Sequence, residues 1–140
     1  MTVKEYLKQY EEADRLVKQL KIEYEEESEK IDTIRSSVGD GTPHGGSVSN
    51  EVETRALRLI DKADKLKRAQ LDAMQIRQEI YDTIQKIPGD EGTVLYMRYI
   101  ALKKFEIIAE EMHFSLSNIY KIHKKARDLV AECIVLQMML

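Results

Sequence analysis

Apolar residues in the first third of the chain recur in alternating steps of three and four. The series begins at Val3 and Tyr6 and ends at Ile31 and Ile34, and Glu27 is the charged residue within it. Steps of this kind form the a/d seam of a coiled coil. Residues 3–36 are therefore predicted to form one long helix of about 50 Å at the standard rise per residue. The seam consists of Val3, Tyr6, Tyr10, Ala13, Val17, Leu20, Tyr24, Glu27, Ile31 and Ile34.

Residues 36–50 interrupt this pattern with four glycines, four serines and a proline. Such a composition is typical of a flexible connector, so neither helix nor strand is expected here. A second long helix is predicted from about Glu51 to Ile87, with Asn50 as its N-cap and Glu53 as the capping-box partner. Its apolar positions are Ala56, Leu59, Ala63, Leu66, Ala69, Ala73, Ile76, Ile80, Ile84 and Ile87.

The two long helices, residues 1–87, are interpreted as a stalk with two possible arrangements. They can fold back on each other as an antiparallel hairpin, or each can pair with its copy in another subunit. Residues 88–140 are interpreted as a separate domain. Pro88-Gly89-Asp90 ends the second helix, and Asp90 is predicted to cap a third helix from about Glu91 to Leu102. Val94, Leu95, Tyr99 and Leu102 are its predicted core residues.

The stretch from Phe105 to Arg127 shows two short helical periods separated by a turn at His113. Ile108 and Ala109 lie in the first period, and Ser115 can cap the second with its hydroxyl. Ile119, Ile122 and Ala126 then recur at helical spacing toward the first helix. This order of two short helices around a tight turn is typical of a helix-turn-helix.

Charge separates the two helices of this motif. From His113 to Arg127 there are four basic residues and no acidic one, whereas Glu106, Glu110 and Glu111 belong to the first helix. In a helix-turn-helix the start of the second helix meets base edges, and later basic residues meet phosphates. The base-facing candidates are Leu116, Ser117, Asn118, Tyr120 and Lys121, and the phosphate-contacting candidates are Ser115, Lys124, Lys125 and Arg127.

The segment VLYMRYIALKKFEIIAEEMHFSLSNIYKIHKKARDL, about a third of the chain, resembles region 4 of the sigma-70 family. Leu95, Arg98 and Tyr99 match its leading helix, and the two periods described above match its helix-turn-helix. Leu116 and Tyr120 stand where sigma factors hold base-reading arginines, so their promoter preference does not transfer. The resemblance implies contact with RNA polymerase or its sigma factor.

At the level of the whole chain, an acidic helical N-terminus before such a module resembles small phage transcription regulators of the RinA and ArpU type. This resemblance implies a phage or prophage protein that acts on late genes.

Composition limits the other classes of function. The net charge is -3 over 140 residues, so any contact with nucleic acid must be local. Cys133 is the single cysteine, which excludes an intrachain disulfide and fits the cytoplasm. The N-terminus lacks the apolar core of a signal peptide, and the apolar run Cys133–Leu140 is too short to span a bilayer. No catalytic constellation, metal-ligand cluster or cofactor motif is found. His113 is interpreted as a turn residue and His123 as a neighbour of solvent or phosphate.

The sequence therefore predicts an all-α protein, a helical stalk followed by a helix-turn-helix. Its predicted function is that of a sequence-specific regulator of transcription that binds double-stranded DNA as a homo-oligomer, without an enzymatic activity. The alternative is a DNA-binding packaging protein like the small subunit of a phage terminase, or a coiled-coil assembly protein. The regulator and this alternative would both use long helices to oligomerise, so the stalk does not distinguish them.

Overall fold

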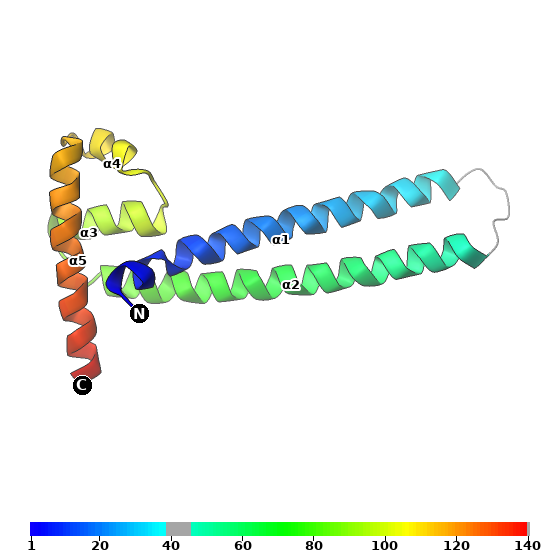
Figure 1. The fold of residues 1–140 in the computed structure, drawn as a ribbon, viewed down its shortest axis with the longest axis horizontal. Helices are drawn as coiled ribbons and strands as arrows, with labels where there is room; N and C mark the ends of the chain where they lie inside the picture. The colour runs from blue at the N-terminus through cyan, green and yellow to red at the C-terminus, as the bar shows by residue number, and fades with distance from the viewer. Residues whose placement is uncertain (39–45, 140) are drawn as a thin grey trace. The chain divides into compact units, whose positions relative to one another are not determined.

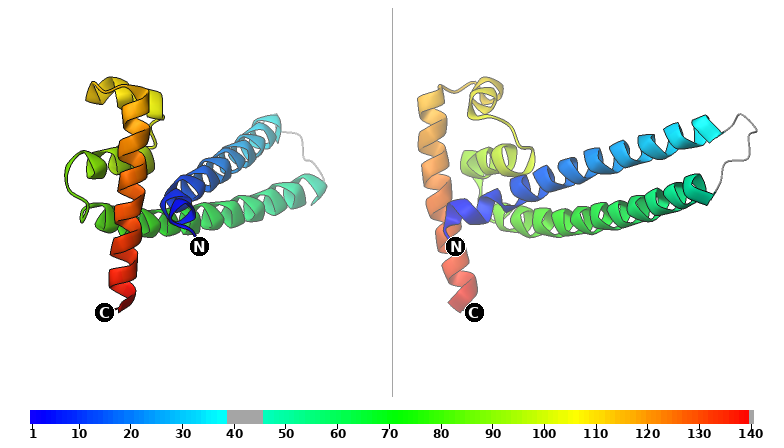
Figure 2. Two further views of the ribbon diagram at one scale, coloured as in Figure 1. Left: turned by 60° about the vertical axis from the view of Figure 1, so that its left-hand side comes forward. Right: turned by 45° about the vertical axis from the view of Figure 1, so that its right-hand side comes forward.

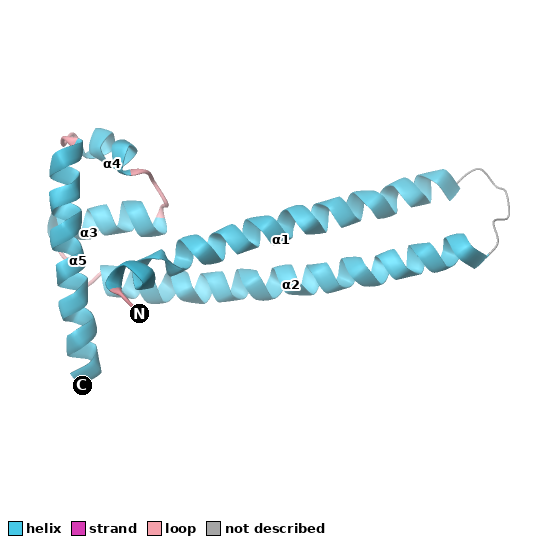
Figure 3. Cartoon of the chain, viewed as in Figure 1, coloured by secondary structure: helices cyan, strands magenta, loops and turns pink. Residues whose placement is uncertain are grey.

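The computed structural model describes the backbone of residues 1–38 and 46–139 and the side chains of residues 1–33 and 50–139. All regular structure in these ranges is helical, and short loops join the helices (Figure 3). The expected all-α class is therefore confirmed for the described part of the chain. The elements are α1 (Val3–Val38), α2 (Gly46–Ile84), α3 (Gly89–Leu95), a π-helical turn η1 (Tyr96–Ile100), α4 (Phe105–Met112) and α5 (Leu116–Met139) (Figure 1).

The two predicted seams account for the burial along α1 and α2. Each seam residue from Val3 to Ile31, and each from Ala56 to Ile87, is buried or half-buried. Leu7, which lies beside the seam and was not among its predicted members, is fully buried. α1 also starts with a capping box that the sequence analysis missed. The Thr2 hydroxyl accepts from the Glu5 N–H at 3.1 Å, and the Glu5 carboxylate accepts from the Thr2 N–H at 2.9 Å.

The predicted connector is shorter than expected. α1 continues to Val38 and α2 begins at Gly46, so the prediction of a non-helical connector was wrong for residues 37–38 and 46–50. Residues 39–45 of the connector lie outside the described residues. Asn50 is not an N-cap but lies inside α2, where its carbonyl accepts from the Thr54 hydroxyl at 2.8 Å. Adding residues to an existing long helix avoids the cost of nucleation, and this outweighs the weak helix propensity of glycine and serine.

The chain divides into two compact units. Unit 1 comprises Met1–Ala13 and Ala73–Leu140, and unit 2 comprises Asp14–Asp72. In unit 2 the segments of α1 and α2 run in opposite directions (Figure 1). Its buried side chains, among those the structure describes, are Glu27, Ile31 and Ala69. Unit 2 is thus a pair of helices with a thin core and several exposed apolar residues, namely Leu16, Ile22, Leu57, Ile60 and Leu71.

Unit 1 has a denser core, in which the first turns of α1 and the last turns of α2 meet α3, η1 and α5. The Tyr6 and Thr83 hydroxyls form a hydrogen bond of 2.8 Å at its edge. These turns of α1 and α2, which the sequence analysis assigned to the stalk, therefore share a core with the C-terminal helices. The buried members are Leu7, Ile80, Ile84, Ile87, Leu95, Tyr99, Ile100, Ala126 and Val130.

The turn between α2 and α3 is tight because it contains glycine. α2 ends at Ile84, Gly89 has a φ of 73°, and a Cβ on Gly92 would lie 2.0 Å from the Ile87 carbonyl oxygen. Pro88 is the N-cap of α3 and makes no side-chain cap. The prediction that Asp90 caps this helix was wrong. Asp90 lies in the first turn instead, where its charge is favourable to the helix dipole.

The predicted third helix is not a single α-helix. After Leu95 the chain widens into η1, and the Ala101 N–H donates to the Tyr96 carbonyl at 2.9 Å. The following Leu102 has a φ of 57°, in the left-handed region that few branched residues occupy. The predicted core residues Val94, Leu95 and Tyr99 are buried, whereas Leu102 is half-buried in the loop before α4.

Candidate nucleic-acid interface

α4 and α5 are joined at a sharp, well-bonded turn. α4 ends at Met112, and His113 takes the left-handed conformation with φ 59° and ψ 38°. The Phe114 N–H donates to the Ala109 carbonyl at 3.0 Å, which satisfies a carbonyl at the end of the helix. The predicted turn at His113 is confirmed. Histidine tolerates this backbone region better than most residues do.

Ser115 starts α5 as the sequence predicted. Its hydroxyl accepts from the Asn118 N–H at 3.1 Å, the position that an N-cap serves. By contrast, α4 begins after Lys104 with no side-chain cap. The start of α5 is therefore the better anchored of the two helix ends.

A small apolar core shared by α3, α4 and α5 fixes which face of α5 points outward. Val94, Ile108, Ala109 and Ile119 are its buried members. Ala109 of α4 and Ile119 of α5 thus belong to one cluster, and α5 contacts both α3 and α4 (Figure 2). With Ile119 turned inward, residues that are two positions away along the helix face solvent.

The predicted site residues fall into two groups by exposure. Six are exposed at the surface, and Leu116, Asn118 and Arg127 are half-buried. Five of the nine line one open hollow of about 540 Å³, which contains no acidic side chain. The exposed group is Ser115, Ser117, Tyr120, Lys121, Lys124 and Lys125, and the hollow is lined by Leu116, Ser117, Tyr120, Lys121 and Lys124.

The basic residues of α5 differ in how far their charge is compensated. Lys125 Nζ lies 3.3 Å from a Glu91 carboxylate oxygen. A backbone hydrogen bond, followed by the Lys125 ammonium, lowers the pKa of Glu91. Among the described residues, Lys121 and Lys124 have no carboxylate within ion-pair distance. These two lysines are therefore the cations of α5 that remain available to an anionic partner.

Arg127 lies closer to the interior than the sequence suggested. The residue is half-buried, and its Nε is enclosed without a hydrogen-bond partner. Its charge acts on both Tyr99 and His123, and it contributes to lowering the pKa of His123. Arg127 thus lies beside the core of unit 1, apart from the hollow.

His123 is not the solvent or phosphate neighbour that the sequence analysis proposed. Its Nε2 forms a 2.6 Å hydrogen bond with the hydroxyl of the buried Tyr99, and its ring packs edge-on against Phe105 at 4.9 Å. Burial, followed by the charges of Arg127, Arg98 and Lys4, lowers the pKa of His123 to about 4. The ring is therefore neutral near pH 7. Its position four residues after Ile119 places it on the inward face, which is the signal that could have identified it.

Arg98 supports the same cluster from η1. Its guanidinium carbon lies 5.3 Å from the Phe105 ring centroid and 5.6 Å from that of Tyr99. A guanidinium nitrogen is 3.6 Å from the Glu11 carboxylate. Arg98 therefore pairs with both a carboxylate and two aromatic rings. The aromatic cluster of Tyr99, Phe105 and His123 thus fixes the inner side of α5.

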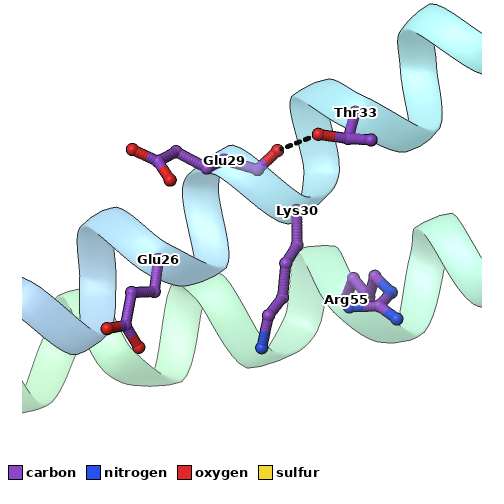
Figure 4. A pocket seen from close by; sticks show the side chains of 5 residues that line it. All are labelled: Glu26, Glu29, Lys30, Thr33 and Arg55. Atoms are coloured by element: carbon purple, nitrogen blue, oxygen red, sulfur yellow. Dashed lines mark hydrogen bonds between the residues drawn. The ribbon is translucent and has the colours of Figure 1, made fainter.

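Unit 2 contains another open hollow, of about 530 Å³, with a different character. Glu26, Glu29, Lys30 and Thr33 line it from α1, and Arg55 lines it from α2 (Figure 4). Thr33 donates its hydroxyl hydrogen to the Glu29 carbonyl, and Arg55 pairs with Glu51 at 3.2 Å. The mixed charges favour neither anion nor cation. Across the described residues no three His, Cys, Asp or Glu side chains are placed to hold a metal ion.

No helix in the described part of the chain is both long and apolar enough to cross a membrane. Comparison with known protein families, with curated proteins and with solved structures found no match to this chain.

Proposed function

We propose that this protein is a sequence-specific DNA-binding regulator of transcription, in which α4 and α5 act as a helix-turn-helix. The observation that carries the proposal is the outward face of α5. This face belongs to a capped helix and combines polar and aromatic side chains with two lysines that lack carboxylate partners among the described residues. A helix of this kind enters the major groove with its first turns at the base edges.

Roles within the interface follow from exposure. Ser117, Tyr120 and Lys121 contact bases, and Lys124 contacts a phosphate. Lys125 is a weaker phosphate contact because Glu91 competes for its charge. Half-buried Asn118 acts at the edge of the interface, whereas Arg127, beside the core of unit 1, has no role in base contact. Ser115 caps the helix, and its N-terminal N–H groups are a favourable position for a phosphate.

The remaining parts of the proposal concern assembly and partners. α1 and α2 form a hairpin stalk that sets the oligomeric state, and the protein works as a homo-oligomer in the cytoplasm. Through its resemblance to region 4, the module contacts RNA polymerase or its sigma factor. That contact would convert DNA occupancy into control of phage or prophage late genes.

A second candidate function is supported by the exposed apolar residues of unit 2. Leu16, Ile22, Leu57, Ile60 and Leu71 are each about half exposed, as expected of an assembly surface. A DNA-packaging or coiled-coil assembly protein would use such surfaces to build many-copy particles. Its DNA binding would show little sequence preference.

The experiment is selection of bound fragments from a random duplex pool, followed by affinity measurements against salt. Lys121→Ala/Lys124→Ala is compared with Lys67→Ala/Arg68→Ala, which removes the same charge from an exposed part of α2. We expect one enriched motif, together with loss of affinity and a shallower salt slope for the α5 variant alone. Tight binding without enrichment would favour the packaging function. An equal loss of duplex affinity in both variants would contradict an interface on α5.

A further inference from the structure

The lining of the hollow on α5 is mostly apolar, although two lysines contribute to it. The Leu116 side chain, the Tyr120 ring and the stems of Lys121 and Lys124 line it, and Ser117 supplies one hydroxyl. Lysine stems commonly cover apolar surface while the ammonium group stays in water. The hollow is therefore apolar inside and has positive charges around it.

Packing contacts hold Leu116 and Tyr120, the two largest apolar side chains that line the hollow, in position. Leu116 is half-buried and packs against the core of Val94, Ile108, Ala109 and Ile119. Tyr120 is 47% exposed, and its ring lies 5.2 Å from that of Phe105 in a tilted arrangement. Phe105 in turn contacts His123 and Arg98. The aromatic cluster thus holds the Tyr120 ring at the surface without covering it.

The chemistry of the major groove offers one natural occupant for such a hollow. Guanine, adenine and cytosine present polar atoms there, and thymine alone adds a methyl group. Arginine, aspartate and glutamate are absent from residues 115–122, and Lys121 is the one residue there of a type that commonly reads guanine. We propose that this hollow receives the 5-methyl group of a thymine in the bound duplex. The inference rests on the proposed DNA-binding function and specifies which base the hollow recognises.

The charges around the hollow agree with this occupant. Lys121 and Lys124 are exposed on the same face, without carboxylate partners among the described residues. They bring the anionic backbone to the helix, while Leu116 and Tyr120 take the one apolar group that the groove presents. A free apolar ligand would gain nothing from the lysines.

The test replaces thymine by deoxyuridine, which keeps the base pair and removes only the methyl group. The probe is the duplex recovered by selection, or alternating A·T duplex if no motif is enriched, with each thymine substituted in turn. We expect one or two substitutions to lower affinity about fourfold, the amount that burial of one methyl group predicts. Substitutions at the other thymines should change affinity little.

Two variants assign the effect to the hollow. Tyr120→Ala should bind the thymine and deoxyuridine duplexes with equal affinity. Tyr120→Phe keeps the ring and should still bind the thymine duplex more tightly than the deoxyuridine duplex. Tyr120 is exposed, so both variants are expected to fold, and circular dichroism checks this. Binding by the wild type with no difference between the two duplexes would overturn the inference and leave the proposed function standing. Absence of any duplex binding at low salt would overturn the proposed function and the inference with it.

Discussion

His123 shows how a residue from a cationic stretch can stabilise the fold without carrying charge. Its ring accepts or donates one hydrogen bond with Tyr99 and lies among three cationic residues, Arg98, Arg127 and Lys4. Protonation there adds a fourth positive charge to a half-buried site. The neutral ring is therefore part of the folded structure, and the exposed lysines provide the charge of α5.

This arrangement predicts a pH dependence of stability. The folded pKa of His123 is about 4 against 6.5 for the free side chain, so the unfolded chain binds a proton first as the pH falls. The stabilisation is complete above pH 6.5 and is lost as the pH falls toward 4. Because solvent screens this half-buried ring, we expect the free energy of unfolding to drop by about 1 kcal/mol between pH 7 and pH 5.

The measurement is urea unfolding across this range for the wild type and for His123→Gln, which keeps a polar side chain but does not titrate. The difference between the two curves isolates His123 from the carboxylates. Parallel curves between pH 7 and pH 5 would show that the imidazole is not buried as described.

At the scale of the elements, the structure agrees with the sequence-based prediction for the helices that have long periodic patterns. It differs from that prediction at the junctions between the helices. α4 and the start of α5 were predictable because the His113 turn and the Ser115 cap depend on local residues. The α2–α3 turn depends instead on the close approach of Gly92 to the Ile87 carbonyl. The η1 turn likewise has no local signal, since packing against the core decides it.

The candidate site likewise has features that the sequence predicts and features that it does not. Exposure of Lys121 and Lys124 follows from helical spacing relative to Ile119. The pairing of Lys125 with Glu91 and the half-buried position of Arg127 depend on contacts with segments far along the chain. Such contacts cannot be deduced from one sequence. The sequence thus predicted which helix faces outward but not which of its charges remain available.

Glu27 is the residue in the seam of α1 at which a substitution should stabilise the protein. It is only 5% exposed, and its Oε1 has no hydrogen-bond partner. A buried carboxylate oxygen without a partner loses hydration that nothing replaces. We expect Glu27→Leu to raise the free energy of unfolding by about 1–3 kcal/mol, because an apolar residue completes the seam.

Thermal and urea unfolding measure this effect, with Glu25→Leu at an exposed position as the matched control. The control should change the free energy of unfolding by no more than about 0.5 kcal/mol. Destabilisation by Glu27→Leu would mean that the carboxylate has a partner in the assembled protein. In that case the seam would be an interface between copies and not a finished core.

At the scale of the whole molecule, the proposed function makes DNA binding depend on self-association. One copy offers two uncompensated lysines on α5, so under the proposed function we expect it to release few counterions and to bind DNA weakly at physiological salt. Beyond them, α5 ends in an exposed apolar surface: Val135 is 55% exposed and Leu136 is 61% exposed, beside a hollow that they line with Ala131 and Glu132. A second copy docked on this surface would double the number of phosphate contacts and cover the apolar residues.

We therefore expect the wild type to self-associate and Val135→Glu to weaken that association. Gln137→Glu is the matched control, because it adds the same charge two residues away at another exposed position. Sedimentation equilibrium measures the association, and DNA affinity should fall together with it for Val135→Glu alone. Since Val135 is exposed, thermal stability of the monomer should be unchanged within about 0.5 kcal/mol. If Val135→Glu leaves both association and affinity as in the wild type, copies must join elsewhere, and the exposed leucines and isoleucines of unit 2 become the surface to mutate next.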